Sequence, residues 1–173
     1  MTALFYCSAC EAIDPQYNEA ARRIVRAAAL RGYTIASGGT VKGTMRIVCE
    51  EAQRAGAPTR GVLPRFMLGL EYPGMTQTVW TDTMSERKEL MREGVDIAIA
   101  LPGGIGTMDE LFETLVLAKL GRFGGRIAAL NINGFYDPLD ALLRHFVKEG
   151  MLEEKDRARL LLPRTAEELE ALL

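Results

Sequence analysis

The residues best suited to chemistry are Glu110, Arg87 and a run of glycines between them. The stretch from Leu101 to Glu113 reads LPGGIGTMDELFE, so three glycines fall within its first six positions, directly after a hydrophobic stretch and directly before a helical pattern. Glycine lets the backbone approach a ligand closely. The amide groups at a helix start attract anions, helped by the helix dipole. Glu110 would then place a carboxylate beside a bound phosphate, where it can do acid, base or electrostatic work.

A second glycine loop, SGGTVKG at 37–43, also follows a hydrophobic stretch and opens a helical pattern. Neither loop is a P-loop, because G-x-x-x-x-G-K-[ST] is absent, and neither has the dinucleotide-binding spacing G-x-G-x-x-G. Either loop alone is equally well explained as a tight turn. Two such loops at one edge of a sheet predict a phosphorylated ligand.

Both chemical candidates also have an ordinary structural interpretation. Thr107 to Glu110 has the T-x-x-E pattern of a capping box, as do Thr83 to Glu86 and Thr165 to Glu168. Spacing alone therefore favours Glu110 as a capping residue. Arg87 alone is typical of a solvated charge on a helix.

The elements that would position these residues alternate between strand and helix along the whole chain. Strands are expected at 3–7, 33–36, 59–64, 76–81, 96–101 and 126–132, with a seventh at 157–163. Helices are expected at 16–31, 45–55, 84–94, 109–120, 137–149 and 165–173, and a loop at 65–76.

Because the strands are apolar almost throughout, the pattern predicts an α/β fold with a doubly wound, mainly parallel sheet of about seven strands and helices on both faces. Ligands bind beyond the carboxyl ends of such strands. The loops at 7–14, 37–43, 82–87 and 102–107 are therefore expected to form the site.

Composition narrows the classes of protein. The chain has 173 residues, 48% of them hydrophobic, and a formal charge of −2. This predicts a single domain, 1–173, with no basic surface for nucleic acid. No signal peptide and no apolar run of about 18 residues are seen, so we expect no membrane segment. The odd count of three cysteines argues against disulfides, and a cytoplasmic protein is expected.

Two blocks of sequence resemble the paired signature of the LOG family. Members of this family are cytokinin-activating phosphoribohydrolases that were once labelled lysine decarboxylases. The family pairs M-H-E-R-K with P-G-G-x-G-T-x-x-E, and this chain has MSERK at 84–88 and PGGIGTMDE at 102–110. The segments FYCSA, SGGTVKGTM and GFYDPLDALL are similar to further family segments, so the resemblance covers nearly the whole chain. The chain departs from the pattern at Ser85, Ser37, Thr44 and Arg46.

The resemblance implies a Rossmann-like domain that hydrolyses the N-glycosidic bond of a nucleoside 5′-monophosphate. The products would be ribose 5-phosphate and a free base, either adenine or an N6-modified adenine such as a cytokinin. Glu110 and Arg87 would be catalytic. The substrate and its phosphate would contact Ser8, Gly38, Gly39, Thr40, Met84, Lys88, Gly103, Gly104, Ile105, Gly106 and Thr107. The resemblance further implies a homodimer, buried through helices flanking 84–94, and no metal or cofactor.

Other functions are less well supported by the residues. A lysine decarboxylase needs a pyridoxal-phosphate lysine in a recognisable setting, and none is found. Cys7 and Cys10 form a C-x-x-C pair, but the helix start at Asp14-Pro15 comes too late for a redox motif, and no second pair completes a zinc site. A nucleotide-binding sensor or carrier without catalysis, using the same loops, stays open as the alternative.

Overall fold

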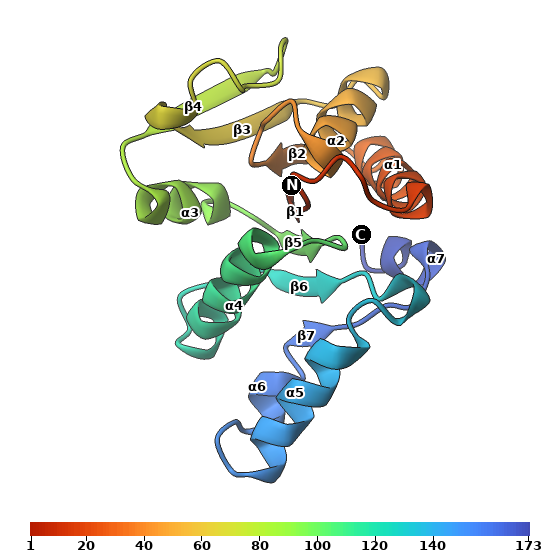
Figure 1. Ribbon diagram of the computed structural model, residues 1–173, viewed down its shortest axis with the longest axis vertical. Coiled ribbons are helices and arrows are strands. Elements are labelled where there is room, and N and C mark those ends of the chain that lie inside the picture. Colours follow the sequence, from red (N-terminus) through yellow and green to blue (C-terminus); the bar gives the residue numbers. More distant parts are fainter.

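In the computed structural model, which describes residues 1–173, seven strands form one sheet in the order β4-β3-β2-β1-β5-β6-β7 (Figure 1). Every neighbouring pair of strands is parallel. This confirms the predicted sheet. The strands are β1 (Thr2–Tyr6), β2 (Thr34–Ser37), β3 (Thr59–Pro64), β4 (Gln77–Thr81), β5 (Ile97–Ala100), β6 (Arg126–Ala129) and β7 (Leu160–Leu161).

Helices cover both faces of the sheet, as a doubly wound fold requires. Helices α1, α2 and α7 contribute to one buried hydrophobic cluster, and α3, α4 and α5 contribute to a second. Their bounds are α1 (Pro15–Leu30), α2 (Gly43–Arg54), α3 (Met84–Arg92), α4 (Ile105–Lys119), α5 (Asp137–Lys148), α6 (Glu154–Arg157) and α7 (Ala166–Glu170), with short 3-10 turns η1 (Arg65–Met67) and η2 (Ile132–Gly134).

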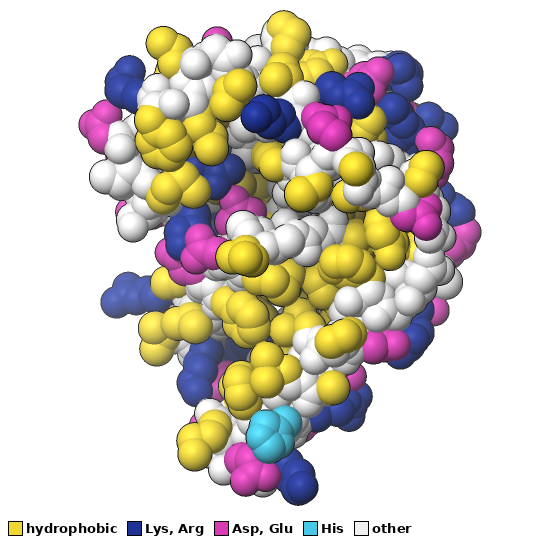
Figure 2. All heavy atoms as spheres, viewed as in Figure 1, with side chains coloured by type: hydrophobic (Ala, Val, Ile, Leu, Met, Phe, Trp, Pro, Cys, Tyr) yellow, Lys and Arg dark blue, Asp and Glu magenta, His cyan; other side chains and the backbone are white.

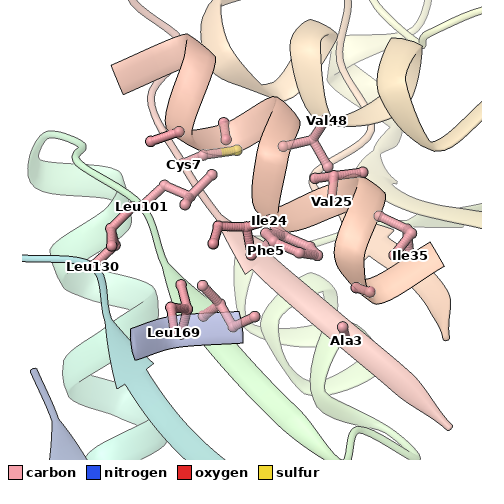
Figure 3. Close-up of a cluster of buried hydrophobic side chains, with 14 of the residues drawn as sticks. Ala3, Phe5, Cys7, Ile24, Val25, Ile35, Val48, Leu101, Leu130 and Leu169 are labelled. Atoms are coloured by element: carbon pink, nitrogen blue, oxygen red, sulfur yellow. The ribbon is translucent and has the colours of Figure 1, made fainter. Parts of the chain in front are cut away.

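Successive residues of each central strand belong alternately to the two clusters. In β1, Ala3 and Phe5 belong to the first cluster, whereas Leu4 and Tyr6 belong to the second. Figure 3 shows Phe5 packed among side chains of α1, including Ile24. Because successive side chains of a strand point to opposite faces, strands covered on both sides are apolar at every position, which explains their unbroken hydrophobic runs.

The direction of winding reverses between β1 and β5, which are neighbours in the sheet although far apart in sequence. A crevice beyond the carboxyl ends of strands at such a switch point is the usual ligand site of open α/β sheets. Gly38 follows β2, Thr83 follows β4 and Gly104 follows β5, so all three lie at this edge, as predicted.

Three local expectations differ from the structure. Helix α4 begins at Ile105, not at residue 109. The expected strand at 157–163 is reduced to the two residues of β7, and the short helix α6 precedes it. The loop at 65–76 contains the turn η1 and an antiparallel bridge between Thr40 and Glu71. No helix combines the length and the apolar character needed to cross a membrane.

Candidate active site

A buried ion pair joins α3 to α4 at the carboxyl edge of the sheet. Arg87 donates from Nη1 to Oε1 of Glu110 over 2.8 Å, and each residue is only 7% exposed. Arg87 also donates from Nε to the carbonyl of Val62 in β3 over 2.9 Å. The strand therefore fixes the guanidinium, and the guanidinium holds one oxygen of Glu110. The second carboxylate oxygen makes no hydrogen bond within the chain.

Gly38 makes room for this arrangement. A Cβ atom at that position would overlap Nη2 of Arg87. The guanidinium of Arg87 lies so close to the backbone of Gly38 that any side chain there would displace it. This close approach explains the glycine that follows β2.

Burial and charge act on Glu110 in opposite directions. Removal from water raises the pKa of its carboxyl group above the usual value, and the neighbouring Arg87 only partly offsets this effect. Perturbed carboxyl groups of this kind are common at functional sites.

The start of α4 leaves backbone amides without partners. Gly104 is the N-cap residue and supplies no side chain, and the first helical hydrogen bond runs from the amide of Met108 to the carbonyl of Gly104 over 3.1 Å. The amides of residues 105–107 and the hydroxyl of Thr107 therefore make no hydrogen bond within the chain. Free amides at a helix start form a ready anion site.

The capping-box interpretation of Glu110 is wrong. Thr107 lies inside the first turn of α4, and the Glu110 carboxylate faces Arg87. By contrast, Thr83 caps α3 by accepting from the amide of Glu86, and Thr165 caps α7 by accepting from the amide of Glu168.

The second glycine loop does not repeat this geometry. At the start of α2, the amide of Gly43 donates to Oε1 of Glu11 over 3.0 Å, and the amide of Thr44 donates to the carbonyl of Ser8 over 2.9 Å. These two amides are already satisfied, whereas the start of α4 leaves three consecutive amides free for an anion.

One pocket of about 290 Å³ collects most of the predicted residues. Its lining includes Ser8, Gly38, Thr40, Met84, Arg87, Gly104, Ile105, Gly106, Thr107 and Glu110. Sequence reasoning missed the remaining lining residues, which are Phe5, Cys7, Ala9, Cys10, Met45 and Met67. They are apolar or sulfur-containing. Several lie in the segments FYCSA and SGGTVKGTM, but such a side chain does not by itself indicate contact with a ligand.

Three predicted residues lie outside this lining. Gly39 packs its backbone against Gly61, and Gly103 lies where a Cβ atom would overlap the side chain of Thr107. Lys88 points elsewhere, because its ammonium group lies 2.8 Å from Oδ1 of Asp109 and pairs with Glu113. It is therefore engaged by carboxylates and not free for a phosphate.

The four residues that depart from the family pattern also lie outside the pocket lining. Ser85 lies on a separate surface cleft with Glu89 and Arg92. Arg46 pairs with Glu50 at 3.8 Å. Ser37 and Thr44 are buried, where Ser37 accepts a hydrogen bond from the amide of Gly39 and Thr44 donates to Asn18.

The fold and the pocket define an α/β protein of the doubly wound class with a buried Arg–Glu pair at its switch point. Residues 45–173 match a family described as "Possible lysine decarboxylase". The chain belongs to this family, and its resemblance to the LOG proteins is confirmed by curated relatives.

Two of these relatives illustrate the similarity. The cytokinin riboside 5′-monophosphate phosphoribohydrolase LOG of Oryza sativa subsp. japonica is 32% identical over 166 residues, covering 95% of this chain and 69% of the relative. The cytokinin riboside 5′-monophosphate phosphoribohydrolase of Rhodococcoides fascians is 31% identical over 159 residues, covering 90% of this chain and 80% of the relative.

Solved structures share the fold at lower identity. The molybdenum cofactor binding protein of Rippkaea orientalis superposes with a TM-score of 0.75 at 18% identity, covering 99% of this chain and 94% of that one. The molybdenum cofactor carrier protein of Chlamydomonas reinhardtii gives the same values. At this identity the likeness establishes the architecture alone.

Proposed function

We propose that this protein hydrolyses the N-glycosidic bond of a nucleoside 5′-monophosphate, releasing the base and ribose 5-phosphate. The observation that carries the proposal is the Arg87–Glu110 pair, buried in the same pocket as the open start of α4. The relatives named for this reaction supply the substrate class.

The 5′-phosphate would bind at the start of α4. The free amides of residues 105–107 and the hydroxyl of Thr107 offer four donors at the positive end of the helix dipole. Glu110 lies three residues further along the same helix, about 4.5 Å along its axis. This spacing would hold the sugar of a phosphate-anchored nucleotide near the carboxylate.

Glu110 would then act on the sugar. Glycosidic bonds break through an oxocarbenium-like transition state, which a nearby carboxylate stabilises. The Glu110 oxygen that makes no hydrogen bond is available to the sugar or to an attacking water, while Arg87 holds the other. Water gives its hydroxyl group to C1′ and its proton ends on the released base. Arg87 would orient Glu110 and favour its ionised form.

The pocket lining contributed by elements other than α4 favours a base recognised by packing. Met45, Met67 and Met84 contribute flexible thioethers there, and methionine adapts to ligands of varied shape. An apolar, adaptable wall suits adenine or an adenine with an N6 substituent, in keeping with the names of the relatives.

Two other functions fit the pocket less well. Pyridoxal-phosphate chemistry needs a lysine, and no lysine lines the pocket. A carrier that only binds nucleotide gains nothing from a buried carboxylate near the phosphate, because Glu110 would repel it. Retention of that carboxylate therefore favours catalysis.

The direct test is release of free base. The protein would be incubated with AMP, N6-isopentenyl-AMP, GMP, IMP, CMP and the matching nucleosides, and free base would be measured by chromatography. We expect base from a purine monophosphate and little from its nucleoside. Binding of AMP without base release from any substrate would establish the non-catalytic carrier instead.

We also propose a homodimer that uses an apolar surface on α4, which flanks the 84–94 segment, and extends this surface onto α5. A groove of about 150 Å³ lies there, and Figure 2 shows hydrophobic side chains gathered over this region. Val116, at the rim, is 54% exposed. Light scattering should give the mass of two chains for the parent and of one for Val116→Glu, with Leu30→Glu on α1 as control. A monomeric parent would contradict the dimer.

The expected compartment is the cytoplasm. All three cysteines, Cys7, Cys10 and Cys49, are free thiols, the state that a reducing compartment maintains.

A further inference from the structure

A buried tyrosine contacts the chain just before the loop that opens α4. Tyr136 follows the turn η2 and is 2% exposed. Its hydroxyl donates to the carbonyl of Leu101 over 2.7 Å. Leu101 is fully buried, with its side chain in the first core cluster (Figure 3). It directly precedes the Pro102-Gly103-Gly104 loop.

The Leu101 carbonyl needs this partner because it lies just beyond the sheet. The last hydrogen bond between β5 and the chain after β6 runs from the amide of Leu130 to the carbonyl of Ala100 over 2.9 Å. Without Tyr136, the Leu101 carbonyl would be a buried acceptor with no partner, which protein structures rarely tolerate.

The segment between β6 and α5 is built to aim the tyrosine. Asn131 accepts from the amide of Tyr136 over 2.7 Å and donates to Oδ1 of Asp137 over 2.7 Å. The amide of Asn131 is itself held by the carbonyl of Pro163 over 2.7 Å. Asn133 has a φ of 54°, a left-handed conformation that is uncommon outside glycine. The turn is held at several points, so the position of Tyr136 is fixed by its neighbours.

We propose that Tyr136 is a positioning residue for nucleotide binding: its hydrogen bond to Leu101 fixes the direction in which the glycine loop leaves β5, and so aims the free amides of α4 at the 5′-phosphate. The proposal rests on the proposed function for the identity of the anion. Tyr136 does not line the pocket, so it acts only through the loop.

Tyr136→Phe tests the proposal, because it removes one hydroxyl and keeps the ring. Tyr33→Phe is the matched control: Tyr33 is also 2% exposed, and its hydroxyl makes no hydrogen bond within the chain. Without the hydrogen bond from Tyr136, the loop is no longer held in the conformation that binds phosphate. If binding weakens by the free energy of one buried hydrogen bond, the KM and Kd for AMP should rise about tenfold. The kcat and the Kd for adenosine, which has no phosphate, should stay near parent values.

Amide hydrogen exchange gives a readout independent of activity. Exchange of the hydrogen-bonded amides on either side of the loop, those of Leu101 and Met108, should be faster in Tyr136→Phe and unchanged in Tyr33→Phe. Unchanged AMP affinity, equal weakening of AMP and adenosine, or faster exchange throughout the chain would overturn the proposal. If the parent protein releases no base, the proposed function fails, yet AMP binding and exchange still decide the role of Tyr136.

Discussion

Replacing Glu110 with glutamine removes the charge of the carboxylate while keeping its size and its acceptor for Arg87. A catalytic carboxylate acts through charge and basicity, which the amide lacks. Loss of such a group typically lowers the rate about 10² to 10⁴ fold. We therefore expect the kcat for base release to fall by that amount, with a smaller change in the KM for the nucleotide.

The same change should leave folding almost intact, and the structure gives the reason. The pKa of Glu110 is raised because desolvation outweighs its attraction to Arg87. A carboxyl group with a higher pKa in the folded than in the unfolded protein makes folding less favourable as it ionises. Glutamine resembles the un-ionised form, so the free energy of unfolding at neutral pH should lie within about 1 kcal/mol of the parent value or above it.

The sign of this effect can be checked against pH. Below the ordinary carboxyl pKa of 4.5, Glu110 is protonated in both states and the parent and variant should be similarly stable. As the pH rises from there through the raised pKa of the folded state, only the parent loses stability through ionisation. Urea unfolding from pH 4 to 8, run beside the chromatographic assay, measures both quantities. Base release at the parent rate, or a variant more than about 3 kcal/mol less stable, the loss typical of a broken buried ion pair, would refute the reasoning.

Further outcomes follow from neighbouring contacts. Arg87→Met removes the charge that lowers the pKa of Glu110, so the acid limb of the kcat/KM profile should move to higher pH and kcat/KM should fall. Gly103→Ala introduces a Cβ atom that overlaps Thr107 and should raise the KM for AMP, whereas Gly124→Ala meets no atom within 4 Å and should not. AMP at 100 times its Kd should stabilise the fold by about 2.7 kcal/mol in calorimetric unfolding, and adenosine at that same concentration should stabilise it much less.

The order of strands and the edge that holds the site could be predicted because both depend on local signals. Strands buried on both faces must be apolar at successive positions, and glycine loops that open helices mark the carboxyl edge. The ends of helices and strands are predicted less accurately. The helical pattern predicts that α4 starts at Asp109, but the helix begins at Ile105.

Sequence spacing could not separate the three T-x-x-E segments, since it carries no information on what faces each glutamate. Glu86 and Glu168 lie at exposed helix starts and serve their own helices. Glu110 faces an arginine from another helix. The same limit applies to Lys88, which motif comparison placed on the phosphate and which Asp109 and Glu113 instead engage. Both outcomes are set by packing between α3 and α4.

The start of α4 gathers several features that each weaken a fold. Helix α4 has no capping side chain, whereas Thr83 caps α3. The missing cap costs α4 about 1 kcal/mol of stability. Gly106 in the first turn costs about 1 kcal/mol relative to alanine. The raised pKa shows that ionised Glu110 is held at a further cost. Scattered along the chain, these features would need no common cause. They all lie between Gly104 and Glu110 and all face one pocket. A bound nucleotide would occupy the free amides and give the carboxylate a sugar to stabilise, so the local losses and the proposed reaction have one explanation.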